Sequence, residues 1–328
     1  MCDRCTVYHF IAFKTFLTLT RVFVSCYPYD DVSSQRNIPP SELSALEDIY
    51  ADTNGETWNW HGENGRWNFS GDPNPCLGWQ GINCTLPNNE SIYLHVYTLK
   101  LENYGMKGSI PDSISALRRI SLIDLGDNML TGTIPSTLSS LLNLTIFNVS
   151  SNNLHGCLPI FNEQLAALQL SYNGFSCGLE SLTTQQELSF IDIAHNRFTG
   201  KFPNDLFKLP NLRALVGGVN CFSGTINAED CNLPEATDII LDGLHTAPHC
   251  RRYIWESWRL TDAFFVKRGV KGTLPNCLVK LPKLTTLHMS GNGFTGTLPA
   301  LSAASPLSKV IFSYNELTGT IPDSYQTH

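Results

Sequence analysis

The fold is decided by one stretch, Ile123-Asp124-Leu125-Gly126-Asp127-Asn128-Met129-Leu130-Thr131-Gly132-Thr133-Ile134-Pro135, which recurs along the chain. With Asn128 as the marker, equivalent positions follow one another at spacings of 21 to 24 residues. These positions are Tyr104, Asn128, Asn152, Asn173, Asn196, Asn220, Leu244, Arg268, Asn292 and Asn315. Self-similarity at such a period indicates a repeat architecture, here of about ten units.

Two apolar positions precede each marker and share its period. They are Leu99 and Leu101 in the first unit and Ile123 and Leu125 in the second. Apolar residues at a spacing of two indicate a short strand with one buried face. A unit of about 24 residues cannot bury such a face alone, so stacked neighbours must provide a continuous core.

The other recurring residues of the unit also have physical roles. The amide of the marker asparagine can hydrogen-bond backbone groups that the turn after the strand leaves unpaired. The glycine four residues later, Gly132 in the quoted unit, permits a backbone conformation closed to other residues. The proline that follows, Pro135, fixes the dihedral before the return segment.

The pattern L-x-x-L-x-L-x-x-N-x-L-x-G-x-I-P, which covers residues 93–322, resembles the plant-specific class of leucine-rich repeats. Receptor-like kinase ectodomains, receptor-like proteins and polygalacturonase-inhibiting proteins carry this class of repeat. The resemblance implies an α/β solenoid, a right-handed superhelix with a parallel sheet on its concave face. It is less specific for function, because one fold hosts many functions.

Residues 27–92 resemble the N-terminal cap of that family. Residues 39–52 predict a helix, with Ser41 as a suitable N-cap. The segment from Cys76 to Cys84 resembles the family's C-x-W-x-G-V-x-C element, with one extra residue before Trp79. The resemblance implies a Cys76–Cys84 disulfide, and a pair of free buried thiols is the alternative. Such a cap would cover the apolar end of the first repeat.

The two ends of the chain are less regular. An apolar stretch runs from Ile11 to Val24, but Lys14 and Arg21 interrupt it. We therefore take residues 1–26 as a weak signal peptide or leader, with a weak anchor or a misassigned start as alternatives. Residues 93–328 hold the repeats, and we expect no C-terminal cap there, because the family's terminal cysteine pair is missing.

Cysteines and glycosylation sequons point to an oxidising compartment. The chain has 11 cysteines, and Asn-x-Ser/Thr sequons start at five positions. These are Asn68, Asn83, Asn89, Asn143 and Asn148. We expect a secreted protein, or one on the extracellular face of the plasma membrane or in the cell wall. The net charge of -7, without a basic stripe, argues against nucleic-acid binding.

The sixth to eighth units depart from the pattern. Gly217 replaces a core aliphatic residue, and Leu244 and Arg268 replace two consecutive marker asparagines. Four cysteines lie in the same stretch, Cys221, Cys231, Cys250 and Cys277. Because the spacing stays at 24, we expect no insertion and a regular strand at residues 263–265. The disulfides would compensate for a degraded repeat, or the stretch is a specialised binding region.

The outward residues between the core positions suggest where a ligand binds. In order they are Lys100, Asp124, Asn148, Gln169, Asp192, Val216, Ile240, Phe264, His288 and Ile311. The first five are polar, whereas four of the last five are apolar, and aspartates flank the apolar run. A glycan on Asn148 would leave the C-terminal half open. The predicted ligand-binding residues are Val216, Asp238, Ile240, Asp242, Asp262, Phe264 and His288. The alternative is that β-branched residues simply favour strands.

Enzymatic motifs are absent from the sequence. There is no phosphate-binding glycine loop, no G-x-S-x-G and no H-E-x-x-H, and the pair Cys2 and Cys5 stands alone. We therefore expect no cofactor, no metal and a non-enzymatic module that recognises a protein, peptide or glycan. A secreted inhibitor of cell-wall-degrading enzymes and a structural or adhesive wall protein are the alternatives. Attachment to a membrane also stays open.

Overall fold

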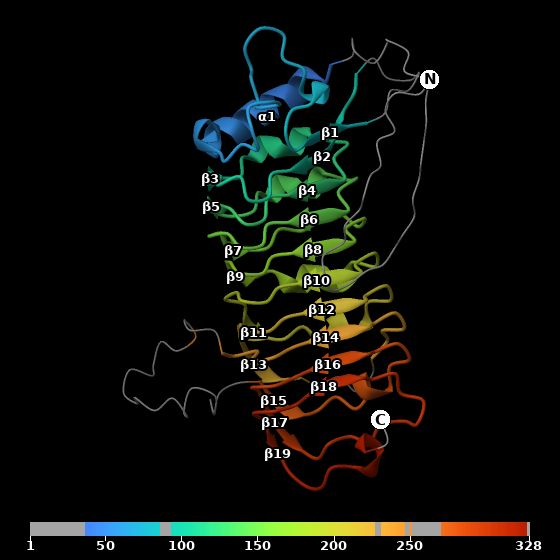
Figure 1. Cartoon of the computed structure of the whole chain (residues 1–328). Helices are drawn as coiled ribbons and strands as arrows, with labels where there is room; N and C mark the ends of the chain where they lie inside the picture. Colours follow the sequence, from blue (N-terminus) through green and yellow to red (C-terminus); the bar gives the residue numbers. More distant parts are fainter. Residues whose placement is uncertain (1–36, 86–92, 227–230, 247–249, 251–269, 327–328) are drawn as a thin grey trace, which may run out of the picture.

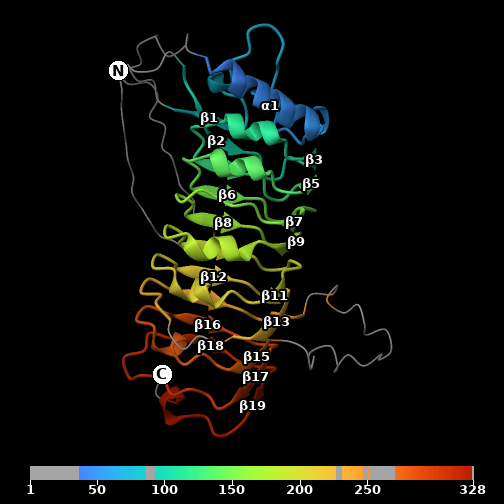
Figure 2. The same cartoon turned by 180° about the vertical axis from the view of Figure 1, so that it is seen from behind.

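The protein is a solenoid whose repeats stack along one axis, with a helical cap at its N-terminal end (Figure 1). A computed structural model describes residues 37–85, 93–226, 231–246, 250 and 270–326. It has the expected fold, a right-handed leucine-rich-repeat superhelix. Its parallel sheet forms the concave face, and short 3-10 helices lie behind that sheet (Figure 2).

The main sheet has ten strands that follow one another in sequence order. Nine of them are parallel and come from the repeats. They are β2 (Val96–Lys100), β4 (Leu122–Asp124), β6 (Ile146–Asn148), β8 (Ala167–Gln169), β10 (Phe190–Asp192), β12 (Ala214–Val216), β14 (Asp238–Ile240), β16 (Thr286–His288) and β18 (Lys309–Ile311). The tenth, β1 (Ile82–Cys84), belongs to the cap and pairs antiparallel with β2.

The prediction of a regular strand at residues 263–265 is wrong. Strand β14 pairs directly with β16, so that Ile239 stands opposite Leu287 and no strand lies between them. The separation of these two strands along the chain is two periods, so the intervening stretch adds one period without adding a strand to the sheet. An insertion as long as one repeat preserves the spacing, which is why the period alone could not detect it.

The outgoing segments of the repeats form smaller parallel sheets along one edge of the stack. Five strands make the largest of them: β11 (Thr199–Lys201), β13 (Cys221–Thr225), β15 (Val270–Thr273), β17 (Gly293–Gly296) and β19 (Glu316–Leu317). Two pairs lie nearer the cap: β3 (Lys107–Ser109) with β5 (Met129–Thr131), and β7 (His155–Cys157) with β9 (Gly174–Cys177). Strand β13 pairs directly with β15, so no further strand lies between these two in the smaller sheet either.

A ladder of asparagines ties each repeat to the one before it. The side-chain amide of Asn128 donates to the carbonyls of Leu101, Leu125 and Gly126 at 2.7, 3.0 and 2.9 Å, and its oxygen accepts from the Met106 N–H at 3.0 Å. The same set of bonds recurs at Asn152, Asn173, Asn196, Asn220, Asn292 and Asn315. The predicted role of the marker is therefore confirmed, and we call these residues the asparagine ladder.

Leu244 interrupts the asparagine ladder, and the backbone replaces the missing amide. The Phe222 N–H, which would meet the next asparagine, donates instead to the Leu244 carbonyl at 2.8 Å. The Leu244 side chain is fully buried, and its N–H donates to Asn292 at 2.9 Å. Asn292 thus bridges directly to the repeat of β14 across the insertion.

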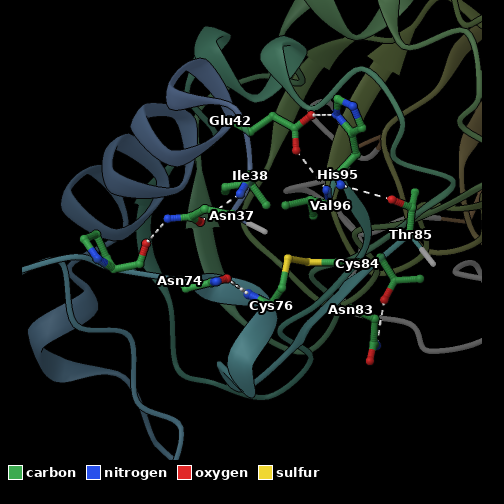
Figure 3. The surroundings of a disulfide bond; sticks show 12 residues. Asn37, Ile38, Glu42, Asn74, Cys76, Asn83, Cys84, Thr85, His95 and Val96 are labelled. Carbon is green, nitrogen blue, oxygen red and sulfur yellow. Dashed lines mark hydrogen bonds and ion pairs between the residues drawn. A yellow bond between two sulfur atoms is a disulfide. The ribbon is translucent and has the colours of Figure 1, made fainter. Parts of the chain in front are cut away.

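Helix α1 (Pro40–Asp52) closes the N-terminal end of the solenoid (Figure 1). The prediction of Ser41 as its N-cap is wrong. Pro39 holds that position and the helix begins at Pro40, where the ring fits the first turn. The buried carboxylate of Glu42 accepts from the Val96 N–H at 2.8 Å and contacts Nδ1 of His95, which fixes the helix to β2 (Figure 3).

Four disulfides connect described cysteines. Cys76–Cys84 joins the cap to β1, as the family resemblance implied (Figure 3). Cys157–Cys177 links two neighbouring repeats. The other two, Cys221–Cys250 and Cys231–Cys277, lie around the insertion. The irregular stretch is therefore cross-linked as well as stacked.

Candidate functional site

The C-terminal half of the concave face carries the predicted ligand-binding residues. Val216 stands opposite Ile240 on adjacent strands, and Ile240 stands opposite His288. His288 in turn stands opposite Ile311. Val216, Ile240 and Ile311 are each half-buried. The direct pairing of β14 with β16 therefore places these residues in one continuous row.

Two predicted site residues, Asp262 and Phe264, lie outside the described residues. The sequence placed Phe264 between Ile240 and His288, but the sheet has no strand at that point. That part of the predicted row is wrong, because it depended on the eighth unit being a regular repeat. The other five residues, Val216, Asp238, Ile240, Asp242 and His288, lie on β12, β14 and β16 or directly after β14.

Asp238 begins β14 and is buried, with only 1% of its surface exposed. One carboxylate oxygen, Oδ2, accepts from the hydroxyl of Thr237 at 2.6 Å. The other oxygen, Oδ1, is buried and has no hydrogen-bond partner. A buried carboxylate oxygen without a partner is costly, so this atom needs an explanation.

Asp242 and His288 form a pair that links the repeats of β14 and β16. Oδ1 of Asp242 accepts from the Ser290 N–H at 2.5 Å, which fixes the carboxylate across the two repeats. Its Oδ2 lies 3.5 Å from Nδ1 of His288. The other ring nitrogen of His288, Nε2, is buried without a partner. Two unsatisfied polar atoms therefore lie on neighbouring strands.

A second apolar row on the concave face escaped the sequence reasoning. Residues two positions before Val216, Ile240 and their equivalents point to the same side of the sheet, because strand side chains alternate. This row is half-buried and apolar through the middle of the solenoid, with Leu122, Ile146, Ala167 and Phe190. Together the two rows make an apolar track that crosses the face diagonally towards Val216 and Ile240. Reading the same period two residues earlier would have found it.

In the N-terminal half of the same face, the row that contains Asp124 and Asn148 is polar and internally bonded. Asn148 donates to Oδ1 of Asp124 at 2.8 Å and accepts from the N–H and hydroxyl of Ser150. Burial raises the pKa of Asp124, while the bonds from Gly126 and Asn148 oppose that rise. Because Asn148 is only 2% exposed and its nitrogen is used, a glycan does not fit there. The expectation of a glycan on Asn148, which would leave only the C-terminal half open, is therefore wrong.

The sequons at Asn68, Asn83 and Asn143 have exposed side chains, whereas Asn89 lies outside the described residues. Among the described residues, no group of three His, Cys, Asp or Glu side chains is placed to hold a metal ion. Within the same ranges, no helix has the length and apolar character needed to cross a bilayer.

Sequence comparison supports the repeat class. A family model described as Leucine Rich Repeat matches residues 119–141, 187–209 and 283–303. Pollen receptor-like kinase 2 of Arabidopsis thaliana is 30% identical over 168 residues, which is 51% of this chain and 22% of that protein. The chain thus spans about a fifth of this relative's length.

Structural comparison leads to the same group of proteins. The ectodomain of the receptor kinase GASSHO1/SCHENGEN3 of Arabidopsis thaliana, in complex with CASPARIAN STRIP INTEGRITY FACTOR 2, superposes with a TM-score of 0.70 at 25% identity. The match covers 87% of this chain and 31% of that one. The plant peptide hormone receptor RGFR1, in complex with RGF2, gives a TM-score of 0.59 at 26% identity, over 69% of this chain and 33% of the receptor.

Proposed function

Because this chain is a leucine-rich-repeat protein of the plant type, we propose that it is a non-enzymatic recognition module of a receptor-type or secreted protein. Its ligand is a protein or a peptide, and its place of action is extracellular. The receptor ectodomains to which it is similar were solved with bound partners, one of them a peptide hormone receptor. The sequons with exposed side chains and the four disulfides fit that compartment.

The observation that carries the proposal is the half-exposed apolar row on the concave strands. Val216 and Ile240 stand side by side, and Ile311 continues the row beyond His288. Partly exposed apolar side chains at adjacent positions of a concave sheet form a surface that a ligand can cover. Asp238, Asp242 and His288 supply the polar groups that orient it. Asp262 and Phe264 stay candidates from the sequence alone.

A peptide suits this surface better than a compact partner. The strands are about 4.8 Å apart, so an extended chain crossing them meets a new repeat every one to two residues. From β4 to β14, each strand offers two outward side chains, and at least one of them is apolar. Binding energy is then distributed over a few buried anchors, as is common in interfaces.

The test is selection of binders from a displayed random-peptide library with the oxidised, full-length protein. Peptides that bind the concave face should lose at least tenfold in affinity for an Ile240→Asp variant. The matched control is Leu142→Asp, because Leu142 is 68% exposed, follows a 3-10 helix and lies off the concave strands. Selected peptides that tolerate Ile240→Asp and lose affinity for Leu142→Asp would contradict the proposal.

A further inference from the structure

Asn83 lies at the N-terminal end of the concave face, on the edge strand β1. Its side chain is exposed, and it stands opposite Thr98 in the antiparallel pair of β1 and β2. Directly opposed residues of paired strands point to the same side of a sheet. Thr98 in turn stands opposite Leu122, the first residue of the second apolar row. Asn83 therefore extends this row to the edge of the sheet.

This position distinguishes the sequon of Asn83 from the other sequons that the structure describes. Asn68 lies in the cap before β1, and Asn143 follows the 3-10 helix Ser136–Ser140 behind the sheet. Asn148 lies on the concave face, but its side chain is buried. Among the described sequons, Asn83 thus combines an exposed side chain with a place on the concave sheet.

The hydrogen bonds of Asn83 are compatible with a modified amide. Its Nδ2 donates one hydrogen to Oγ1 of Thr98 at 2.9 Å. An asparagine amide has two N–H groups, so a sugar can replace the second hydrogen while the first keeps this bond. The hydroxyl of Thr85, the third residue of the sequon, accepts from the His95 N–H at 3.1 Å (Figure 3). The folded strand pair therefore accommodates a glycan on Asn83.

The outward residues beside Asn83 are polar, whereas the apolar rows begin further along the sheet. On β2 these residues are Thr98 and Lys100, and on β4 the first apolar one is Leu122. Strands lie about 4.8 Å apart, so Leu122 is two strands, or about 10 Å, from Asn83. An N-linked glycan is bulky and solvated. On Asn83 it covers the polar end of the face and leaves the apolar rows open from β4 onwards.

From this position we infer that Asn83 carries an N-linked glycan, which covers the end of the concave face formed by β1 and β2 and limits the ligand surface there. The donor is a lipid-linked oligosaccharide diphosphate of the secretory pathway. A bond forms between Nδ2 and C1 of the first N-acetylglucosamine, the bond from C1 to the phosphate oxygen breaks, and Nδ2 loses one proton. This inference rests on the proposed function, since it requires an extracellular protein.

The experiment uses the full-length protein secreted from plant cells in the presence of kifunensine, so that endoglycosidase H can trim each glycan to its first sugar. Mass mapping of peptides should find this sugar on Asn83 in more than half of the molecules. A polymer-linked succinimidyl ester then probes exposed lysines before and after trimming.

Lys100 reports on the covered end of the face. Its N–H donates to the Gly81 carbonyl, which makes Lys100 a diagonal neighbour of Asn83, about 8 Å away. We expect Lys100 to react at least threefold faster after trimming. Lys309 is the matched control, because it is exposed on β18 at the far end of the same face. Its rate should stay the same.

Two variants test the site without trimming. Asn83→Gln removes the sequon, so Lys100 should react as fast as in the trimmed protein. Thr85→Ser keeps the sequon and the hydroxyl that accepts from the His95 N–H, so Lys100 should stay protected.

Asn68 and Asn143 separate this inference from the proposed function. If both carry glycans and Asn83 does not, the inference is overturned and the proposed function stands. The same holds if Lys100 reacts equally fast before trimming, after trimming and in Asn83→Gln. If none of the three asparagines is glycosylated, the extracellular place of action fails together with the inference.

Discussion

Two regions of the solenoid hold neighbouring repeats together in different ways. The first runs from β2 to β12, and the second from β12 to β16. In the first region an asparagine closes each turn from β4 to β12 and bonds to the preceding repeat. In the second, Leu244 replaces an asparagine, a backbone carbonyl takes over its bond, and two disulfides cross-link the surroundings. From this difference we infer that the solenoid can lose an asparagine of the ladder where disulfides connect the same repeats. The same place holds the unsatisfied polar groups of the candidate site.

The largest expected effect lies in the regular region. Asn196 is fully buried, donates to the carbonyls of Leu170, Ile193 and Ala194, and accepts from the Phe175 N–H. Asn196→Ala leaves these groups unpaired, so we expect a loss of about 4 kcal/mol in the free energy of unfolding. Urea denaturation followed by circular dichroism measures it. A loss below about 1 kcal/mol would show that the ladder is not what holds the regular repeats together.

The next largest loss in the free energy of unfolding is expected on removal of the disulfide at the irregular stretch. Cys221–Cys250 closes 29 residues of chain, and the double variant Cys221→Ser, Cys250→Ser should lose about 3 kcal/mol. The same urea measurement applies, with Cys157→Ser, Cys177→Ser as the comparison in a region where the ladder is intact. Equal or smaller loss at Cys221–Cys250 would contradict the idea that covalent links replace the missing asparagine.

The regular repeats could be predicted from the sequence, whereas the insertion could not. The period, the apolar pair of each strand and the role of Asn128 follow from local patterns, and the structure has them. The Cys76–Cys84 disulfide, which the family resemblance implied, is also present. The insertion could not be seen, because its length equals one repeat and leaves the spacing intact. The repeat period shows where in the sequence a strand is expected. Whether those residues join the sheet also depends on whether the rest of the unit forms a regular repeat.

The candidate site was predictable to a similar extent. Val216, Ile240 and His288 lie in one row because alternation along a strand and the repeat period together fix which side chains share a face. The burial of Asp238 and its unpaired oxygen could not be read from the sequence, since both depend on the neighbouring strands. The direct contact between Asp242 and His288 likewise required the omission of a strand between them.

A smaller effect of opposite sign is expected at the edge of the irregular stretch. The residue before each marker in the described ranges takes a left-handed backbone conformation, as at Asp127 (φ 51°) and Val219 (φ 54°). A β-branched side chain is strained there, whereas glycine is not. We expect Val219→Gly to raise the free energy of unfolding by about 1 kcal/mol, measured by urea denaturation. Destabilisation would mean that the packing of Val219 outweighs its backbone strain.

The smallest effect on the free energy of unfolding is expected at Asp192, in the polar row of the concave face. Burial raises the pKa of Asp192, more than its bonds from Ala194 and Ser171 lower it. The folded state therefore binds this proton more readily than the unfolded state. The carboxylate destabilises the fold above its raised pKa, and this penalty disappears as the pH falls below the ordinary value.

Asp192→Asn should accordingly raise stability at pH 7 by about 0.5 kcal/mol and have no effect at pH 3. Melting temperatures across this pH range, with the exposed Asp205→Asn as control, measure the difference. A stabilisation that stays the same at both pH values would contradict the assigned cause.

The account depends most directly on β14 and β16 being neighbours in the sheet, since this pairing creates the continuous row of the candidate site. It can be tested by cross-linking. In the double variant Ile240→Cys, His288→Cys, the two introduced thiols should form a disulfide under mild oxidation, detected by mass mapping of peptides. The double variant Ile240→Cys, Phe264→Cys serves as the comparison. A link between positions 240 and 264, with none between 240 and 288, would show a regular eighth repeat and contradict the account.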